Sequence, residues 1–207
     1  MKAVLMSIQP KFCELIASGK KTVEVRKTKP KLEVPFKVYI YCTKGKPILG
    51  RSLKDDSLKE TPESDFDNYN RDTLFRANGK VIGEFVCDRV DEYRYGVYDG
   101  EFCYHIPTVE GEKTCLEYDE AEEYGNGKPL YFWHITDLVI YDKPRELSYF
   151  FKPRTAEELE ADVVVSVLTC GIHESPFAIK KPPQSWCYVE EGKRWINRRS
   201  MHRRAAL

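Results

Sequence analysis

The first 44 residues contain apolar segments at two different spacings. The run "VLMSIQ", residues 4–9, is short and continuous, as is typical of a buried strand. The next segment, "PKFCELIASG", has its apolar residues at helical spacing, and Pro10 suits the first turn of a helix. Gly19 is suited to end that helix in the left-handed conformation. The pattern therefore predicts a strand followed directly by a short helix.

Two further strands are expected before residue 45. "KTVEVRK", residues 21–27, alternates charged or polar residues with valines, and a basic, proline-bounded loop follows it. "FKVYIYCTK", residues 36–44, is apolar, β-branched and aromatic, which is typical of a central strand. The predicted order is strand, helix, strand, loop, strand.

The middle of the chain is less regular. Residues 45–79 are polar and have no sustained apolar period, so we expect a surface insertion with one short helix near Leu74. "KVIGEFVCDRVDEY", residues 80–93, reads as a long strand with Gly83 as a candidate bulge. A hairpin turning at "YDG", residues 98–100, should follow it.

The last third is expected to hold an acidic helix, a long strand and an apolar strand. "LEYDEAEEYGNG" suits the helix, "PLYFWHITDLVIYD" is strongly β-prone, and "VVVSVLTC" reads as the apolar strand. "RRSMHRRAAL" resembles a free tail. At 207 residues and 42% hydrophobic composition, the chain suits one domain with a sizeable core. The predicted division is a single domain over 1–192, a surface insertion at about 47–79 within it, and a basic C-terminal tail at 193–207.

One short motif brings together residues that can do chemistry. Gly19, Lys21, Glu24 and Arg26 form the pattern G-x-K-x-x-E-x-R. The two cations can meet a phosphate or a polarised carbonyl, and the acid can accept hydrogen bonds from an amide or hydroxyl. Strict alternation puts Glu24 and Arg26 on one face of a strand, so Lys21 can join them only if the strand starts at or after it. A solvated strand face with a Glu–Arg pair is the simpler interpretation of the motif.

The ordered set of segments resembles a known family. The opening helix, "GKKTVEVR", "VYIYCTK", "VIGEF" and "WHITDL" together are similar to the ASCH family of the PUA-like superfamily, and "PPQSWCYV" is similar to its prophage and bacterial members. The resemblance implies an α+β fold: a small, mixed, partly closed β-barrel flanked by helices, with a cleft between the barrel and the first helix. It also implies binding of RNA, and some family members are similar to enzymes acting on nucleic acid or on modified nucleosides.

The resemblance also implies a set of site residues. Lys21 and Glu24 are the candidate catalytic pair, and Gly19 and Arg26 complete the signature. The residues expected to line the same cleft from other segments are Ser7, Pro10, Tyr41, Thr43, Lys44, Trp133, Ser185 and Trp186. Trp133 and His134 alternate along a strand, so one of them should face the core. Trp186 either seals the barrel or stacks on a base.

Two hydrolytic activities remain open. Small PUA-like enzymes that remove the acetyl group of N4-acetylcytidine resemble this chain at Gly19, Lys21 and Arg26, but they have a threonine where this chain has Glu24. Amide hydrolysis by a desolvated Lys21 with Glu24 is chemically conceivable. In a ribonuclease, Lys21 and Arg26 would stabilise the pentacovalent phosphate, while Glu24 or His134 would move the proton of the 2′-hydroxyl.

Charge is distributed unevenly along a chain whose net charge is zero. Residues 1–46 carry eleven Lys or Arg against three Glu, for +8, whereas residues 47–162 carry fourteen against twenty-seven acids, for −13. The tail from 193 to 207 adds +6. Such blocks let a neutral protein present a basic surface to an anionic partner, although a solvated face and a free tail would give the same pattern.

Cysteine and apolar content exclude several classes of protein. The seven cysteines never form C-x-x-C, which argues against a disulfide framework and a zinc ribbon. Cys103 and His105 lack a second pair of ligands nearby, so no metal and no cofactor is expected. Apolar runs are too short for a membrane span or a signal peptide, so we expect a cytoplasmic protein without a membrane partner.

Three functions are compatible with these features. The first is a binding module in which RNA, a nucleotide or a nucleoside meets Lys21, Arg26 and Lys44 and stacks on an aromatic ring. The second is a hydrolase acting on RNA or on a modified nucleoside, with Lys21 and Glu24 handling protons. The third is an interaction protein that uses residues 47–79 and the tail to meet protein partners, whose identity the sequence leaves open.

Overall fold

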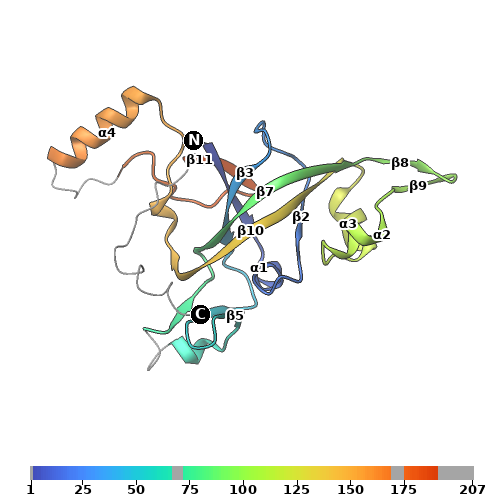
Figure 1. Ribbon diagram of the computed structural model, residues 1–207, viewed down its shortest axis with the longest axis horizontal. Helices are drawn as coiled ribbons and strands as arrows, with labels where there is room; N and C mark the ends of the chain where they lie inside the picture. The colour runs from blue at the N-terminus through green and yellow to red at the C-terminus, as the bar shows by residue number, and fades with distance from the viewer. Residues whose placement is uncertain (1, 67–71, 169–174, 191–207) are drawn as a thin grey trace, which may run out of the picture.

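A six-stranded sheet forms the centre of the protein. The computed structural model describes residues 2–66, 72–168 and 175–190. In the sheet the strands follow the order β11-β1-β3-β7-β10-β2, and every neighbouring pair is antiparallel except β1 and β3. Their bounds are β1 Lys2–Ile8, β2 Val23–Arg26, β3 Phe36–Cys42, β7 Val81–Tyr93, β10 Leu130–Arg145 and β11 Trp186–Glu190. The long strands β7 and β10 run through the middle of the molecule (Figure 1).

Helices flank this sheet, which confirms the expected α+β class. Helix α1, Pro10–Ala17, follows β1 directly and begins at the predicted proline. The other helices are α2 Thr108–Glu112, α3 Tyr118–Gly125 and α4 Ala156–Leu168, with 3₁₀ turns η1 Glu63–Phe66 and η2 Leu147–Tyr149. Helices α2 and α3 lie at the opposite end of the molecule from α4 (Figure 1). Within the described ranges, no helix is long and apolar enough to cross a membrane.

The alternation of strand residues divides the core between two faces of the sheet. On one face, Met6 and Ile40 pack with Ile16 of α1 and with Trp133. On the other face, Leu5, Tyr39 and Tyr41 pack beneath Phe150 and Ile179. At the β2 edge this second face continues as a smaller cluster of Val23, Val25, Tyr104, Ala121, Leu130 and Phe132, to which α3 contributes Ala121. We call the face that carries Ile16 and Trp133 the inner face.

Side chains link the two edge strands of the sheet. Arg26 of β2 donates to the Ser7 carbonyl of β1 (2.7 Å), and Trp186 of β11 donates to the hydroxyl of Thr28, two residues after β2 (3.0 Å). The Lys31 amide also donates to the Tyr188 hydroxyl (2.7 Å). In the described part of the chain β2 and β11 form no backbone ladder with each other. The described strands are therefore not closed into the expected small barrel, and side-chain hydrogen bonds alone link the two edges of the sheet.

Two smaller sheets lie outside the central sheet. The predicted insertion forms a three-stranded sheet of β4 Leu49–Ser52, β5 Ser57–Glu60 and β6 Leu74–Arg76. The prediction of a helix near Leu74 is wrong, because this segment pairs with β4, opposite Ser52. Strands β8 Tyr95–Tyr98 and β9 Glu101–Tyr104 form the predicted hairpin, which turns at Asp99 and Gly100, both with positive φ.

The apolar strand predicted over 163–170 is also wrong. Residues up to Leu168 belong to helix α4, and 169–170 lie outside the described residues. A capping box explains the difference: the Thr155 hydroxyl accepts from the Glu158 amide (3.2 Å), and the Glu158 carboxylate accepts from the Thr155 amide (2.8 Å). A helix started there continues through the β-branched run. The tail at 193–207 also lies outside the described residues.

Gly83 marks a point where two strands come too close for a side chain. A Cβ atom there would lie 2.4 Å from the Val139 carbonyl oxygen of β10, and the β3–β7 register shifts next to it, at the predicted bulge. We expect Gly83→Ala to lower the free energy of unfolding by about 1–3 kcal/mol, because backbone must move. Urea denaturation measures this, with Gly96→Ala, whose Cβ would have ordinary contacts, as the control. Equal stability of the two variants would contradict the close approach.

Candidate functional site

The end of α1 places Lys21 beside the start of β2. Gly19 has a φ of +73°, and its amide donates to the Ile16 carbonyl, so the chain reverses as predicted. The Lys21 amide then donates to the Leu15 carbonyl (3.0 Å), which keeps Lys21 against the helix end. Strand β2 begins only at Val23. Lys21 therefore precedes the strand, as its convergence with Glu24 and Arg26 requires.

Lys21, Glu24 and Arg26 form a buried ion-pair network, which we call the triad. Glu24 Oε1 lies 3.0 Å from Arg26 Nη2, and Glu24 Oε2 lies 3.4 Å from Lys21 Nζ. Lys21 is 2% exposed, Glu24 is 5% exposed and Arg26 is 8% exposed. Charges so far from water are costly unless paired, so the network needs all three members.

Neighbouring groups fix each cation of the triad. Lys21 Nζ donates to the Thr114 carbonyl (2.5 Å) and lies 4.9 Å from the centre of the Phe12 ring on α1. Arg26 Nη2 donates to the Ser7 carbonyl at the end of β1. The Thr114 carbonyl comes from a segment far away in the sequence, and no sequence signal indicates it, whereas Ser7 is one of the residues expected at the cleft. The triad thus joins α1, β1, β2 and the segment after α2.

Strand alternation explains why charges occupy this strand. Glu24 pairs with Trp133 and Arg26 with Tyr131 across the β2–β10 ladder, and Trp133 belongs to the inner face. Val23 and Val25 take the opposite face, in the cluster with Ala121 of α3. The simpler interpretation of the motif, a solvated strand face, is excluded because both faces of β2 are buried.

Three buried polar atoms beside one another in the fold have no hydrogen-bond partner among the described residues. They are Glu24 Oε2, Arg26 Nε and the indole Nε1 of Trp133. Glu24 Oε2 has the ion-pair contact with Lys21, but its geometry is not that of a hydrogen bond. Leaving such groups unpaired costs about 1–3 kcal/mol each. An acceptor and two donors are therefore available to a polar molecule that reaches the inner face.

Four of the other expected residues lie near the carboxyl ends of the parallel strands β1 and β3. The Thr43 amide donates to the Ile8 carbonyl (2.9 Å), and the Ser185 carbonyl accepts from the Ser7 amide (2.9 Å). Pro10 begins α1 just after β1, and Lys44 is exposed just after Thr43. These residues surround the end of β1 that Arg26 contacts, and none of their side chains joins the triad.

Ser7 and Tyr41 depart from the expected arrangement. Tyr41 lies on the face opposite the inner face, in the cluster with Leu5 and Tyr39. The Ser7 hydroxyl donates to the Pro183 carbonyl (2.6 Å), so only its main-chain carbonyl reaches Arg26. Alternation along β1 and β3 causes both outcomes, since each residue follows an inner-face neighbour. Burial raises the pKa of the Tyr41 hydroxyl, which therefore stays protonated.

The two tryptophans have different environments. Trp133 is completely buried and packs edge-on against Phe36, with ring centres 5.4 Å apart. Trp186 is half-buried, and its ring centre lies 6.0 Å from that of Trp133. A hollow of about 470 Å³ is lined by Leu32, Val90 and Phe36, the residue whose ring packs against Trp133, and neither tryptophan lines it. Lys29 also lines this hollow.

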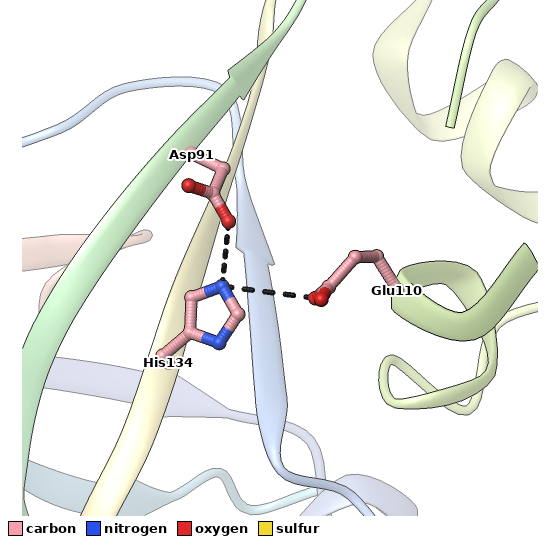
Figure 2. A group of neighbouring side chains, drawn as sticks. All are labelled: Asp91, Glu110 and His134. Atoms are coloured by element: carbon pink, nitrogen blue, oxygen red, sulfur yellow. Dashed lines mark hydrogen bonds and ion pairs between the residues drawn. The ribbon is translucent and has the colours of Figure 1, made fainter. Parts of the chain in front are cut away.

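His134 lies away from the triad, on the opposite side of the β10 strand. Its ring contacts Asp91 of β7 and lies near Glu110 of α2 (Figure 2). The prediction that one of Trp133 and His134 faces the core is thus confirmed, with Trp133 inside. A ribonuclease arrangement in which His134 acts beside Lys21 does not fit this placement. No sequence signal indicates the His134 group, since its members are far apart in the chain.

A buried thiol also borders the triad. Cys13 of α1 packs in the inner-face cluster and donates to the Ile8 carbonyl (3.6 Å). Burial, with smaller contributions from Cys42 and Glu24, raises the pKa of the Cys13 thiol well above its usual value. A protonated, buried thiol is a poor nucleophile, so Cys13 serves packing.

One family model matches most of the chain. The sequence model of the ASCH domain matches residues 6–160, and no curated protein matches the chain. The crystal structure of ASCH from Zymomonas mobilis is 17% identical, with a TM-score of 0.45 over 91% of this chain and 88% of that one. One mutant of that protein is 17% identical, with a TM-score of 0.47 over 91% of this chain and 89% of that one. A second mutant is 16% identical, with a TM-score of 0.44 over 92% of each chain. Because the match spans well over half of the 207 residues, the chain belongs to the ASCH domain family.

Proposed function

We propose that this protein binds RNA, or a nucleotide or nucleoside derived from it, at the triad. The observation that carries the proposal is the group of unpartnered buried atoms, Glu24 Oε2, Arg26 Nε and Trp133 Nε1. A nucleobase edge offers both donors and acceptors, which suits one carboxylate oxygen and two N–H groups. ASCH domains are of the nucleic-acid-binding type, which agrees with this chemistry.

The surroundings of the triad supply the charge and the stacking surface. Lys29, Lys31 and Lys44 are exposed on the segments that follow β2 and β3. These lysines belong to the first 46 residues, whose charge is +8. They would hold phosphates, while the half-buried ring of Trp186 would stack on a base. The hollow lined by Lys29, Leu32 and Phe36 lies beside the inner-face cluster and offers room for a nucleoside.

Salt dependence tests the phosphate contacts. We expect the logarithm of the affinity for single-stranded RNA to fall linearly with the logarithm of salt concentration. Lys44→Gln should make that slope shallower by about 0.7, the value for a single phosphate contact on a single strand. Fluorescence anisotropy at four salt concentrations measures the slope. Lys128→Gln is the matched control, because Lys128 is exposed beside the acidic helix α3. Affinity independent of salt would contradict the proposal.

A hydrolase acting on RNA or on a modified nucleoside is the second candidate. The observation that favours it is the close approach of Lys21 Nζ and Glu24 Oε2, 3.4 Å apart and shielded from water, where a proton can pass between a base and a substrate. Glu24 cannot act as the hydroxyl nucleophile of the N4-acetylcytidine enzymes that this chain resembles.

One gel experiment separates the two candidates. End-labelled single-stranded RNA is incubated with the protein, with and without divalent metal, and run on native and denaturing gels beside a Lys21→Met variant. Shortened RNA that disappears with the variant would indicate a nuclease. A separate assay of acetate release from N4-acetylcytidine is needed to detect an amidohydrolase. A mobility shift of intact RNA supports the binding protein. Met keeps the packing of Lys21 against Phe12, and circular dichroism checks the fold.

A further inference from the structure

Three potential metal ligands from three elements converge outside the triad. Asp91 lies on β7, His134 on β10 and Glu110 on the short helix α2 (Figure 2). His134 Nε2 lies 2.7 Å from Asp91 Oδ2 and 3.8 Å from Glu110 Oε2. One ligand atom from each residue lies within 4.8 Å of the others, and within the described ranges this is the one group of three or more His, Cys, Asp or Glu residues with that property.

The Arg89 side chain contacts all three of these residues, and its contact with His134 competes with the contact between His134 and Asp91. Arg89 Nη2 lies 2.9 Å from His134 Nε2 and 3.4 Å from Glu110 Oε1, while its Nε lies 3.1 Å from Asp91 Oδ2. If Nε2 carries a proton and donates to Asp91, it faces the N–H groups of Arg89. If Nε2 is unprotonated and accepts from Arg89, its lone pair faces the Asp91 oxygen. Whichever form the neutral imidazole takes, one of the two close contacts of Nε2, with Arg89 or with Asp91, is therefore unfavourable.

Glu110 supplies a second, independent observation. Its Oε2 is buried and has no hydrogen-bond partner among the described residues, and it points at the same imidazole nitrogen. Lys113 Nζ donates to the other carboxylate oxygen, Glu110 Oε1 (2.9 Å), and leaves Oε2 without a donor. A buried anionic oxygen without a donor indicates a cation that would lie between it and His134.

We propose that Asp91, Glu110 and His134 bind a divalent transition-metal ion such as Mn²⁺ or Zn²⁺, in place of the Arg89 guanidinium. One imidazole with two carboxylates is a donor set that such ions accept. Metal–ligand bonds of about 2.0–2.2 Å set neighbouring ligand atoms roughly 3 Å apart, and the separations of 2.7 and 3.8 Å lie on either side of that value. The Arg89 side chain is 54% exposed, so it can turn into solvent.

The site would brace the segment that holds the triad. Glu110 lies just before Lys113, whose carbonyl accepts from the amides of Thr22 and Val23, both at 3.1 Å. The next carbonyl, that of Thr114, holds Lys21 Nζ. A metal ion that ties Glu110 to β7 and β10 would therefore also steady Lys21. The metal proposal stands independently of the ligand that the triad binds, since none of its three ligands belongs to the triad.

Mn²⁺ titration of the tag-free protein by isothermal titration calorimetry tests the proposal. Mn²⁺ is the probe because it favours oxygen and nitrogen ligands over the cysteines of this chain. We expect one ion per chain, with affinity reduced at least about tenfold in Asp91→Asn and in Glu110→Gln. Glu112→Gln, on the same helix and exposed, is the matched control and should bind normally. Arg89→Gln should bind Mn²⁺ more tightly, because the competing cation is gone.

The sign of the Arg89→Gln effect separates a metal site from an ordinary ion-pair network. A network would lose a partner and gain no Mn²⁺ affinity. Lack of one-to-one binding in both wild type and Arg89→Gln, or equal affinity in Asp91→Asn and Glu112→Gln, would overturn the proposal. A measurement without any variant keeps the test independent of folding: bound Mn²⁺ should broaden the ring-proton resonances of one of the four histidines selectively, and equal broadening of all four would also count against the site.

Discussion

Replacement of Glu24 by glutamine is expected to lower the free energy of unfolding by about 3–5 kcal/mol. Glutamine has the shape of glutamate, so the change creates no cavity. It removes the carboxylate that pairs Lys21 at 3.4 Å and Arg26 at 3.0 Å, and it presents an NH₂ group to one of these cations. Two buried positive charges would then be uncompensated. The loss is large compared with the 5–15 kcal/mol by which ordinary domains are stable.

Urea denaturation of three proteins checks this expectation. Glu123→Gln, an exposed residue on α3, is the control for the chemical change and should lie within about 0.5 kcal/mol of wild type. A triple variant, Lys21→Met with Glu24→Leu and Arg26→Met, should be more stable than Glu24→Gln alone, because it leaves no charge unpaired. If the single variant were as stable as the control, the triad could not be the buried network described above.

The arrangement of the G-x-K-x-x-E-x-R motif was predictable because it depends on residues that are close together in the sequence. Gly19 ends the helix, and the alternation of Glu24 with Val23 and Val25 fixes which side chains share a face. The condition that β2 starts after Lys21 followed from the same rule. What the motif did not indicate is depth: the triad is buried on the inner face, where Trp133 lies opposite Glu24 and the Thr114 carbonyl holds Lys21. Both residues lie more than 90 positions further along the chain.

The remaining site residues show where one sequence contains too little information. Tyr41 was expected at the triad, but its face depends on the strand register, which pairs it with Ser7 and Val81. The α4 error has a related cause, since the β-branched run after 163 suits a strand until the capping box at Thr155 is considered. No local sequence pattern distinguishes the proposed metal ligands Asp91, Glu110 and His134. They come together only in the tertiary fold.

The triad and the proposed metal site lie on opposite faces of the central sheet, and the segment from Glu110 to Thr114 connects them. At one end this segment carries a ligand of the proposed metal site, and at the other it holds Lys21 by a main-chain carbonyl. The arrangement indicates that the position of Lys21 depends on how firmly this segment is held. A metal ion at the proposed site is therefore expected to steady Lys21 without contacting it.

Replacement of Trp133 by alanine is expected to lower the free energy of unfolding by about 3–5 kcal/mol. Trp133 is completely buried and is the largest such side chain in the described part of the chain. Its ring packs against Phe36 and near Trp186, so alanine would leave a cavity where β10 crosses the inner face. Urea denaturation measures the loss. Tyr149→Ala, whose side chain is 69% exposed, is the control and should change stability by no more than about 0.5 kcal/mol.

Trp133→Phe separates the packing of this ring from the role of its indole N–H. Phenylalanine keeps most of the aromatic packing against Phe36 and removes the buried Nε1 donor, which has no partner among the described residues. Its cost in stability should therefore be clearly smaller than that of alanine, since no hydrogen bond is broken. If a nucleobase accepts from this N–H, the same variant must weaken RNA binding at every salt concentration without changing the salt slope, because an indole N–H carries no charge and displaces no counterion. Unchanged affinity in a folded Trp133→Phe protein would contradict a contact between the ligand and Trp133 Nε1.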